Sequence, residues 1–70
     1  MDDFVFQLGD YVWYRGVPIS SIEVIYKVIR VPRFTDSYDL EDSKGKVSSV
    51  DVRWFHSTDK ASMMEVLLYF

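Results

Sequence analysis

The chain has 70 residues, the length of one small domain, and 49% of them are apolar. Its 11 acidic and 8 basic side chains give a net charge of −3, which disfavours non-specific binding to nucleic acid. It has no cysteine, which excludes disulfides and thiolate metal sites. The start, Met1-Asp2-Asp3-Phe4, is acidic where a secretion signal is basic, and no run reaches the roughly 20 apolar residues of a membrane span, so we expect a cytoplasmic protein with no membrane contact.

The first 15 residues predict an extended arm followed by a strand. Large apolar residues stand at every second position from 4 to 8, the period of an extended segment with one buried face. Gly9 then predicts a turn, and residues 11–15 resume the alternation. In this strand Val12 would face the core and Trp13 would face the opposite way.

Residues 22–31 give the strongest strand signal of the chain. Six of these ten residues are Ile or Val, whose stiff side chains suit a sheet better than a helix. Tyr26 and Val28 share the parity expected of the core, whereas Ile25 and Ile29 share the other. The strand is therefore expected to be partly apolar on both faces.

The next stretch predicts a hairpin. Residues 38–41 alternate, Asp42 opens a turn, and Gly45 supplies the left-handed conformation that such a turn requires. Residues 47–55 return as a fourth strand. Its inward residues are Val50, Val52 and Trp54, so Phe55 is expected on the outward face.

The last 14 residues admit two interpretations. Residues 57–61 are polar and predict a turn or one short helical turn. For residues 63–70 we favour a fifth strand, because four strands alone would leave a barrel open along one edge. The alternative is a helix, with an apolar stripe of Ala61, Met64, Leu67 and Leu68.

These segments resemble the small SH3-like β-barrels, a group that includes Tudor, KOW and plant agenet modules. The matching residues lie between Leu8 and Phe55, and they are Gly9-Asp10-Tyr11-Val12-Trp13, Tyr26-Lys27-Val28-Ile29, Tyr38-Asp39-Leu40, the turn at Gly45 and residues 50–55. The resemblance implies an all-β, five-stranded barrel with an N-terminal extended arm, a single domain over residues 1–70. It also implies a binding function, since such modules take peptides, methylated side chains or nucleic acid.

No pattern in the chain predicts catalysis. The sequence contains no P-loop, zincin or nucleophile-elbow motif. Its one histidine, His56, cannot hold a metal ion without further ligands. We therefore expect no enzymatic activity, no cofactor and no metal. In size and composition the chain resembles small accessory proteins of bacterial viruses, which bind and redirect one host protein.

The favoured function is protein binding through surplus apolar surface. A barrel of this size cannot bury both faces of its sheet, so the apolar residues of outward parity should form a patch. The predicted contact residues are Trp13, Tyr11, Ile25, Ile29 and Phe55, flanked by the acidic pair Asp39 and Glu41 that would steer a basic partner. The partner would be another protein, in the manner of an inhibitor or adaptor.

Two alternatives remain open from the sequence. The first is a KOW- or Tudor-type nucleic-acid-binding domain that contacts phosphates through Lys27, Arg30 and Arg33. The second is self-association into a homo-oligomer through an exposed edge strand, either residues 22–31 or the C-terminal tail.

Overall fold

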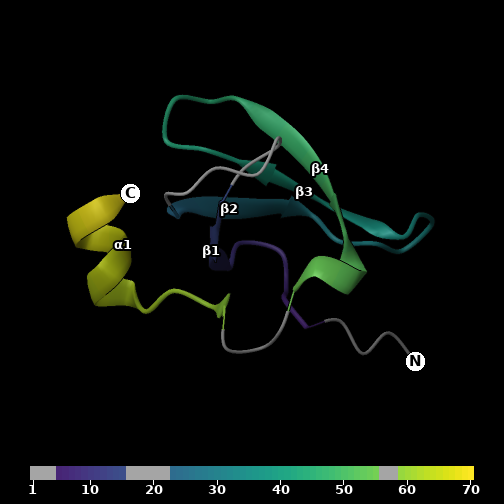
Figure 1. Ribbon diagram of the computed structural model, residues 1–70, viewed down its shortest axis with the longest axis horizontal. Coiled ribbons are helices and arrows are strands. Elements are labelled where there is room, and N and C mark those ends of the chain that lie inside the picture. The colour runs from purple at the N-terminus through teal and green to yellow at the C-terminus, as the bar shows by residue number, and fades with distance from the viewer. Residues whose placement is uncertain (1–4, 16–22, 56–58) are drawn as a thin grey trace.

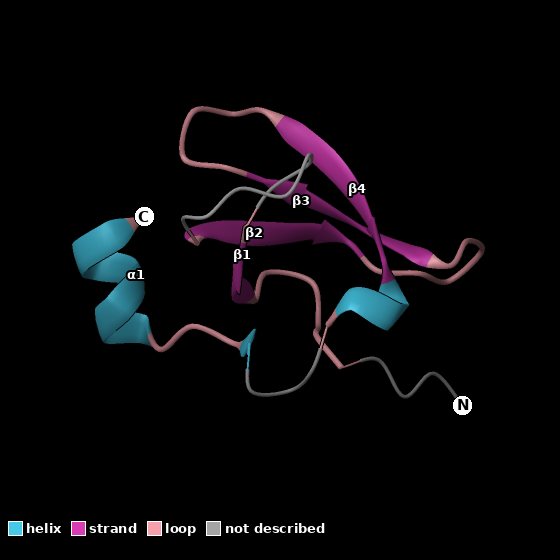
Figure 2. Ribbon diagram, in the orientation of Figure 1, coloured by secondary structure: helices cyan, strands magenta, loops and turns pink. Residues whose placement is uncertain are grey.

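A computed structural model describes residues 5–15, 23–55 and 59–70 of the chain (Figure 1). The described residues form one antiparallel sheet in the order β1-β2-β3-β4, followed by a short 3₁₀ helix and an α-helix (Figure 2). The elements are β1 (Tyr11–Tyr14), β2 (Val24–Arg30), β3 (Ser37–Glu41), β4 (Val47–Asp51), η1 (Val52–Trp54) and α1 (Met63–Tyr69). The mostly β class expected from the sequence is confirmed.

The hairpin between β3 and β4 has the turn that the sequence predicts. The Asp42 Oδ1 atom accepts hydrogen bonds from the backbone N–H groups of Lys44 and Lys46, each at 2.9 Å. Gly45 has a φ of 86°, in the left-handed region where a side chain would be strained. These interactions fix the register, in which Tyr38 lies opposite Val50.

The core lies on one face of the sheet and follows the predicted parity over most of its length. The buried residues that form it are Phe6, Val12, Tyr26, Val28, Tyr38, Leu40, Val50 and Phe55. Three of their rings contact one another: the Phe6 centroid lies 5.6 Å from that of Tyr38 and 5.4 Å from that of Phe55. The backbone N–H of Phe6 donates a hydrogen bond to the Tyr38 hydroxyl at 3.2 Å. The buried ring of Phe6 therefore holds the segment before β1 against the core.

The prediction of a closed, five-stranded barrel is wrong. In the part of the chain that the structure describes, the sheet is open, and residues 63–69 form α1 instead of a fifth strand. The outer edge of β1 is covered by a short bridge instead, in which Lys60 pairs with Val12 and the Ala61 N–H donates to the Tyr11 carbonyl at 2.8 Å. Two backbone residues thus protect this edge without adding a strand.

The prediction that Phe55 faces outward is also wrong, because the chain leaves the strand conformation before it reaches this residue. The Asp51 Oδ1 atom accepts a hydrogen bond from the Arg53 N–H at 2.9 Å and begins η1. The 3₁₀ turn breaks the two-residue alternation. As a result Phe55 is buried at 4% exposure, and Trp54, expected inside, is 61% exposed.

Some sequence predictions fall on residues outside the described ranges. These are the beginning of the N-terminal arm at 1–4, the start of the second strand at Ile22, and the first two residues of the turn expected at 57–61. Among the described residues, no helix combines the length and hydropathy that crossing a membrane would require.

Candidate functional site

The sheet face opposite the core carries three of the residues predicted to bind a partner. Trp13 lies directly across from Ile25 in the β1–β2 register, and Tyr11 lies two residues before Trp13 on the same side of β1. We call these three residues, Tyr11, Trp13 and Ile25, the Trp13 face. Figure 1 shows that α1 lies beside β1 and the start of β2, and it is α1 that contacts this face.

Aromatic contacts and one hydrogen bond join α1 to the Trp13 face. The Trp13 Nε1–H donates to the Glu65 Oε2 atom at 3.2 Å. Ring centroids lie 5.9 Å apart for Trp13 and Tyr69 and 4.9 Å apart for Tyr11 and Phe70. Ile25 is only 3% exposed, so the expectation that it forms part of an open patch is wrong. The chain's own C-terminal segment occupies this side of the sheet.

Local sequence explains why α1 begins where it does. The Ser62 hydroxyl accepts a hydrogen bond from the Glu65 N–H at 3.1 Å, and the Glu65 Oε1 atom accepts one from the Ser62 N–H at 2.8 Å. This reciprocal pair is a capping box. The hydrogen bond that the Glu65 carboxylate accepts from the Ser62 backbone is the main cause that lowers the pKa of Glu65, and side-chain hydrogen bonds with Ser62 and Trp13 act in the same direction. One carboxylate therefore starts the helix and also attaches it to the sheet.

The other side of α1 is apolar and exposed. Its residues stand at positions i, i+1, i+4 and i+5, which share one side of a helix, and between 68% and 80% of each is exposed. They are Met63, Met64, Leu67 and Leu68, which we call the α1 apolar face. Sequence reasoning missed this surface because it favoured a strand here. The Ser62-x-x-Glu65 spacing was the signal for a helix.

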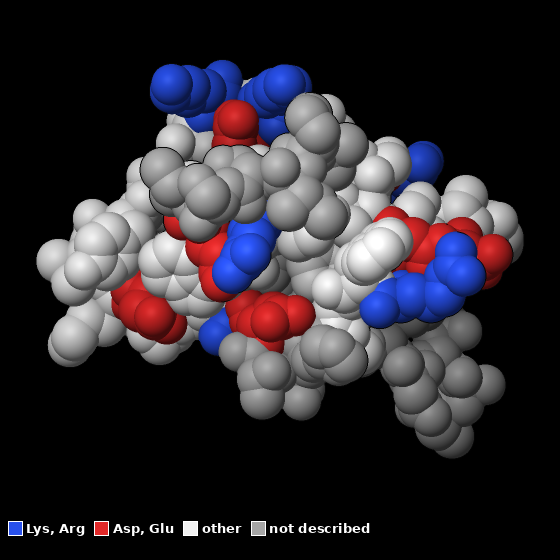
Figure 3. Space-filling model, viewed as in Figure 1, with Lys and Arg blue, Asp and Glu red and all other residues white. Residues whose placement is uncertain are grey.

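The acidic pair does not form a free strip beside Trp13. The Asp39 Oδ2 atom lies 2.9 Å from the Arg30 Nε atom, and its Oδ1 atom accepts a hydrogen bond from the Ser49 hydroxyl at 2.7 Å. Glu41 lies opposite Lys27 in the register of β2 and β3. Each predicted acid thus faces a base that the sequence assigned to the nucleic-acid alternative. In the view of Figure 3, red and blue atoms lie close together at several places on the surface.

The remaining predicted residues lie away from the Trp13 face. Ile29 is half-buried where the register of β2 shifts between Val28 and Arg30. Arg33 lines a hollow of about 260 Å³ after β2, together with Arg30 and Phe34. Phe34 is 97% exposed, which is unusual for so large an apolar side chain.

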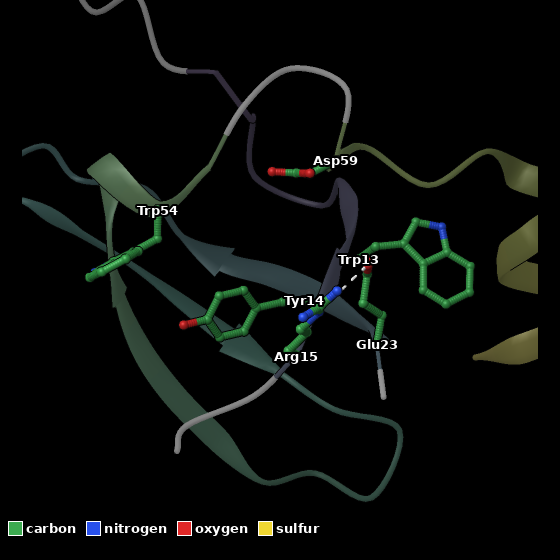
Figure 4. Close-up of a pocket in the computed structure, with 6 residues that line it drawn as sticks. All are labelled: Trp13, Tyr14, Arg15, Glu23, Trp54 and Asp59. Carbon is green, nitrogen blue, oxygen red and sulfur yellow. Dashed lines mark ion pairs between the residues drawn. The ribbon is translucent and has the colours of Figure 1, made fainter. Parts of the chain in front are cut away.

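A second hollow, of about 220 Å³, lies between β1 and η1 (Figure 4). Its lining residues are Trp13, Tyr14, Arg15, Glu23, Trp54 and Asp59. The Arg15 Nε atom lies 3.9 Å from the Glu23 Oε1 atom. Figure 4 shows that the indole of Trp13 points away from Tyr14 and Trp54, so the three rings do not enclose a common space. The arrangement is not that of an aromatic cage for a cation.

Among the described residues, no group of three or more His, Asp or Glu side chains is arranged to hold a metal ion. Comparison with protein-family models, with curated proteins and with solved structures finds no match to this chain. A proposal about function therefore depends on the arrangement of the chain's own residues.

Proposed function

We propose that the chain is a non-catalytic protein-binding module and that α1 carries the contact surface. The observation that supports this is the composition of α1: six of its seven residues are apolar or aromatic, and none of the seven, all of them within the described chain, is buried. A helix that is apolar on all sides is normally surrounded by protein. Here the sheet covers one side only, and a partner would cover the other.

The partner surface that fits the α1 apolar face is an apolar groove. Met63 and Leu67 stand one turn apart, as do Met64 and Leu68, the spacing with which a helix anchors in a groove. Methionine adapts to irregular apolar surfaces better than branched side chains do. The face carries no charge, so an apolar groove would cover it without leaving a buried ion unpaired.

This proposal moves the contact from the sheet to the helix. Trp13 and Tyr11 support α1 from beneath and would act on binding indirectly, by holding it in place. A membrane surface is a poorer fit for the same helix. Interfacial helices carry Lys and Arg on their polar side, whereas the charged residue of α1 is Glu65.

The test is affinity capture from a lysate of the source organism with the tagged chain and two charge variants. Leu67→Glu places a carboxylate at the centre of the α1 apolar face and should reduce capture of a specific partner by at least about tenfold, because burying a leucine contributes roughly 1.5–3 kcal/mol. Phe34→Glu makes the same kind of change at the far end of the molecule and should have no effect. Circular dichroism confirms that both variants fold.

The outcome that contradicts the proposal is equal capture by the wild-type chain and the Leu67→Glu variant. If only the Phe34→Glu variant loses capture, the partner contacts the loop after β2 and not α1. A direct readout follows once the partner is known: its affinity for the purified chain should change in the same order as the captured amounts.

One observation favours the second candidate, nucleic-acid binding. Phe34 stands fully exposed beside Arg33, an arrangement in which a ring can stack on a base while a cation contacts phosphate. Against this, Arg30 is paired with Asp39 and the chain is acidic. Retention on single-stranded DNA at low salt that falls steeply with ionic strength, and falls again with Phe34→Ala, would support this function; no retention at low salt would dispose of it.

A further inference from the structure

The Trp13 face is a surface shaped for a helix. In the structure it holds α1, whose inward residues meet it at two successive turns: Glu65 accepts the indole N–H, and Tyr69, four residues on, lies against the same indole. Ile25 completes the apolar floor and is buried. The face thus selects a helix that has a carboxylate and an aromatic residue four positions apart.

Few interactions join α1 to the Trp13 face in the described part of the chain: one hydrogen bond and two pairs of aromatic rings. The helix has seven residues, fewer than a helix needs to be stable alone, and none of them is fully buried. By contrast Lys60 and Ala61, the two residues before the N-cap Ser62, are held by backbone pairing with β1. Because this pairing does not involve α1, detachment of α1 from the Trp13 face would leave the pairing in place.

We propose that the Trp13 face is a receptor for an amphipathic helix of a partner protein, which takes the place of α1. The incoming helix presents a carboxylate to the Trp13 indole and an aromatic side chain one turn later. This inference concerns a different surface from the α1 apolar face, and the two contacts do not form at the same time, because the first keeps α1 on Trp13 and the second displaces it. Both make the chain a protein-binding module, but here the chain supplies the groove and the partner supplies the helix.

A separate partner fits better than a second copy of the chain. If two copies exchanged α1, each Trp13 face would regain the contacts that it already has, and each α1 apolar face would stay uncovered. A longer helix with a polar outer side contacts more of β1 than the seven residues of α1 do, and it adds no exposed apolar side chains of its own, although the displaced α1 then remains in water. The best ligand is therefore a helix that keeps the inward residues of α1 and differs on its outward side.

The test uses a synthetic peptide built on that argument. It carries residues 62–70 with a glutamine at each outward position and two alanine-rich turns added at its carboxyl end; the replacements are Met63→Gln, Met64→Gln, Leu67→Gln and Leu68→Gln. The receptor is the full chain with Trp54→Phe, which leaves Trp13 as its one indole. Binding should change Trp13 fluorescence in a saturable way.

The decisive comparison weakens α1 in the chain without altering the receptor. Glu65→Ala in the full chain removes the acceptor of the Trp13 N–H and should tighten peptide binding about tenfold, since the apparent affinity rises with the fraction of chains whose face is free. Tyr69→Ala should act in the same direction through the other contact. A peptide with Glu65→Lys is the matched control and should bind at least about tenfold more weakly.

Absence of peptide binding to both weakened chains, with circular dichroism showing a folded sheet, would overturn the proposal. So would equal binding of the peptide and its Glu65→Lys control, which would indicate non-specific apolar contact. Sedimentation addresses self-association: a concentration-dependent dimer that the peptide cannot dissociate would assign the face to a second copy. Peptide binding should be unaffected by Leu67→Glu in the chain, so this result and the capture experiment fail or succeed separately.

Discussion

The core of the sheet and α1 are built from similar side chains but differ in what surrounds them. In the core, Phe6, Tyr38 and Phe55 contact one another from three separate segments of the chain, with centroids 5.4–5.8 Å apart. In α1 an equally apolar run has the sheet on one side and solvent on the other. Apolar composition alone therefore does not separate residues that stabilise this fold from residues available for contact; the packing of neighbouring segments does.

The same difference predicts a hierarchy of stability. Segments with few buried contacts open at lower free energy than the core, and they open independently of it. We expect α1 to detach from the Trp13 face while the sheet remains folded. The substitutions below test this separation, beginning with the largest effect.

Phe55→Ala should cause the largest loss of stability, about 3–5 kcal/mol, because it removes a buried ring and leaves a cavity. Urea denaturation followed by circular dichroism measures the change. Phe34→Ala removes the same ring from a fully exposed site and should change stability by no more than about 0.5 kcal/mol. Equal stabilities for the two variants would show that Phe55 lies at the surface, as the sequence predicts.

Tyr38→Phe tests a polar contact inside the core. The Tyr38 hydroxyl accepts the Phe6 N–H in a buried position, so its removal leaves that donor without this acceptor and should cost about 1–3 kcal/mol. Tyr69→Phe is the matched change on α1, where the ring is exposed and its centroid lies 5.9 Å from that of Trp13. Denaturation midpoints should fall for the first variant and stay the same for the second.

The sequence predicts the core well where strands are regular and fails where they end. Alternation identifies Val12, Tyr26 and Val28 as inward residues because each lies within an unbroken strand. It fails at Phe55, since η1 adds a turn that shifts every following side chain. The two-residue alternation of side chains holds only within a strand, and here it ends where Asp51 accepts a hydrogen bond from the backbone N–H of Arg53.

The candidate site was predicted in part for a similar reason. The sequence places Tyr11, Trp13 and Ile25 on one face, and they lie on one face. It does not predict that α1 covers them, because the argument for the tail rested on closing a barrel. Local capping by Ser62 and Glu65 and the bridge at Lys60 together remove the need for a fifth strand. The local sequence signal for a helix is therefore a better guide to the tail than the expectation that the sheet closes into a barrel.

Ser62→Ala should loosen α1 with little effect on the sheet. Loss of an N-cap hydroxyl destabilises a helix by about 1 kcal/mol. Hydrogen exchange should therefore quicken for amides of α1 and remain slow for those of β2 and β3. Ser43→Ala, an exposed serine in the hairpin turn, is the control. Faster exchange throughout the sheet would mean that α1 and the core unfold as one unit.

The smallest effect should be that of acid on the contact between α1 and Trp13. The hydrogen bonds from Ser62 and Trp13 favour the charged form of Glu65 and lower its pKa. A group whose pKa is lowered in the folded state stabilises that state above its unfolded pKa and loses this contribution as pH falls through the lowered value. Trp13 fluorescence in the Trp54→Phe chain should therefore shift toward that of an exposed indole as the solution is acidified.

The control for this titration is Glu65→Gln, which keeps an oxygen acceptor but has no proton to gain. Its fluorescence should stay constant over the same range. The pKa of Asp51 is also lowered, by hydrogen bonds from Arg53, but this residue caps η1 and does not touch Trp13, so it should not contribute to the signal. A titration that survives in Glu65→Gln would place the acid sensitivity outside Glu65, for example at Glu23 or Asp59, which line a hollow with Trp13, and the signal would then not report on the contact between α1 and the sheet.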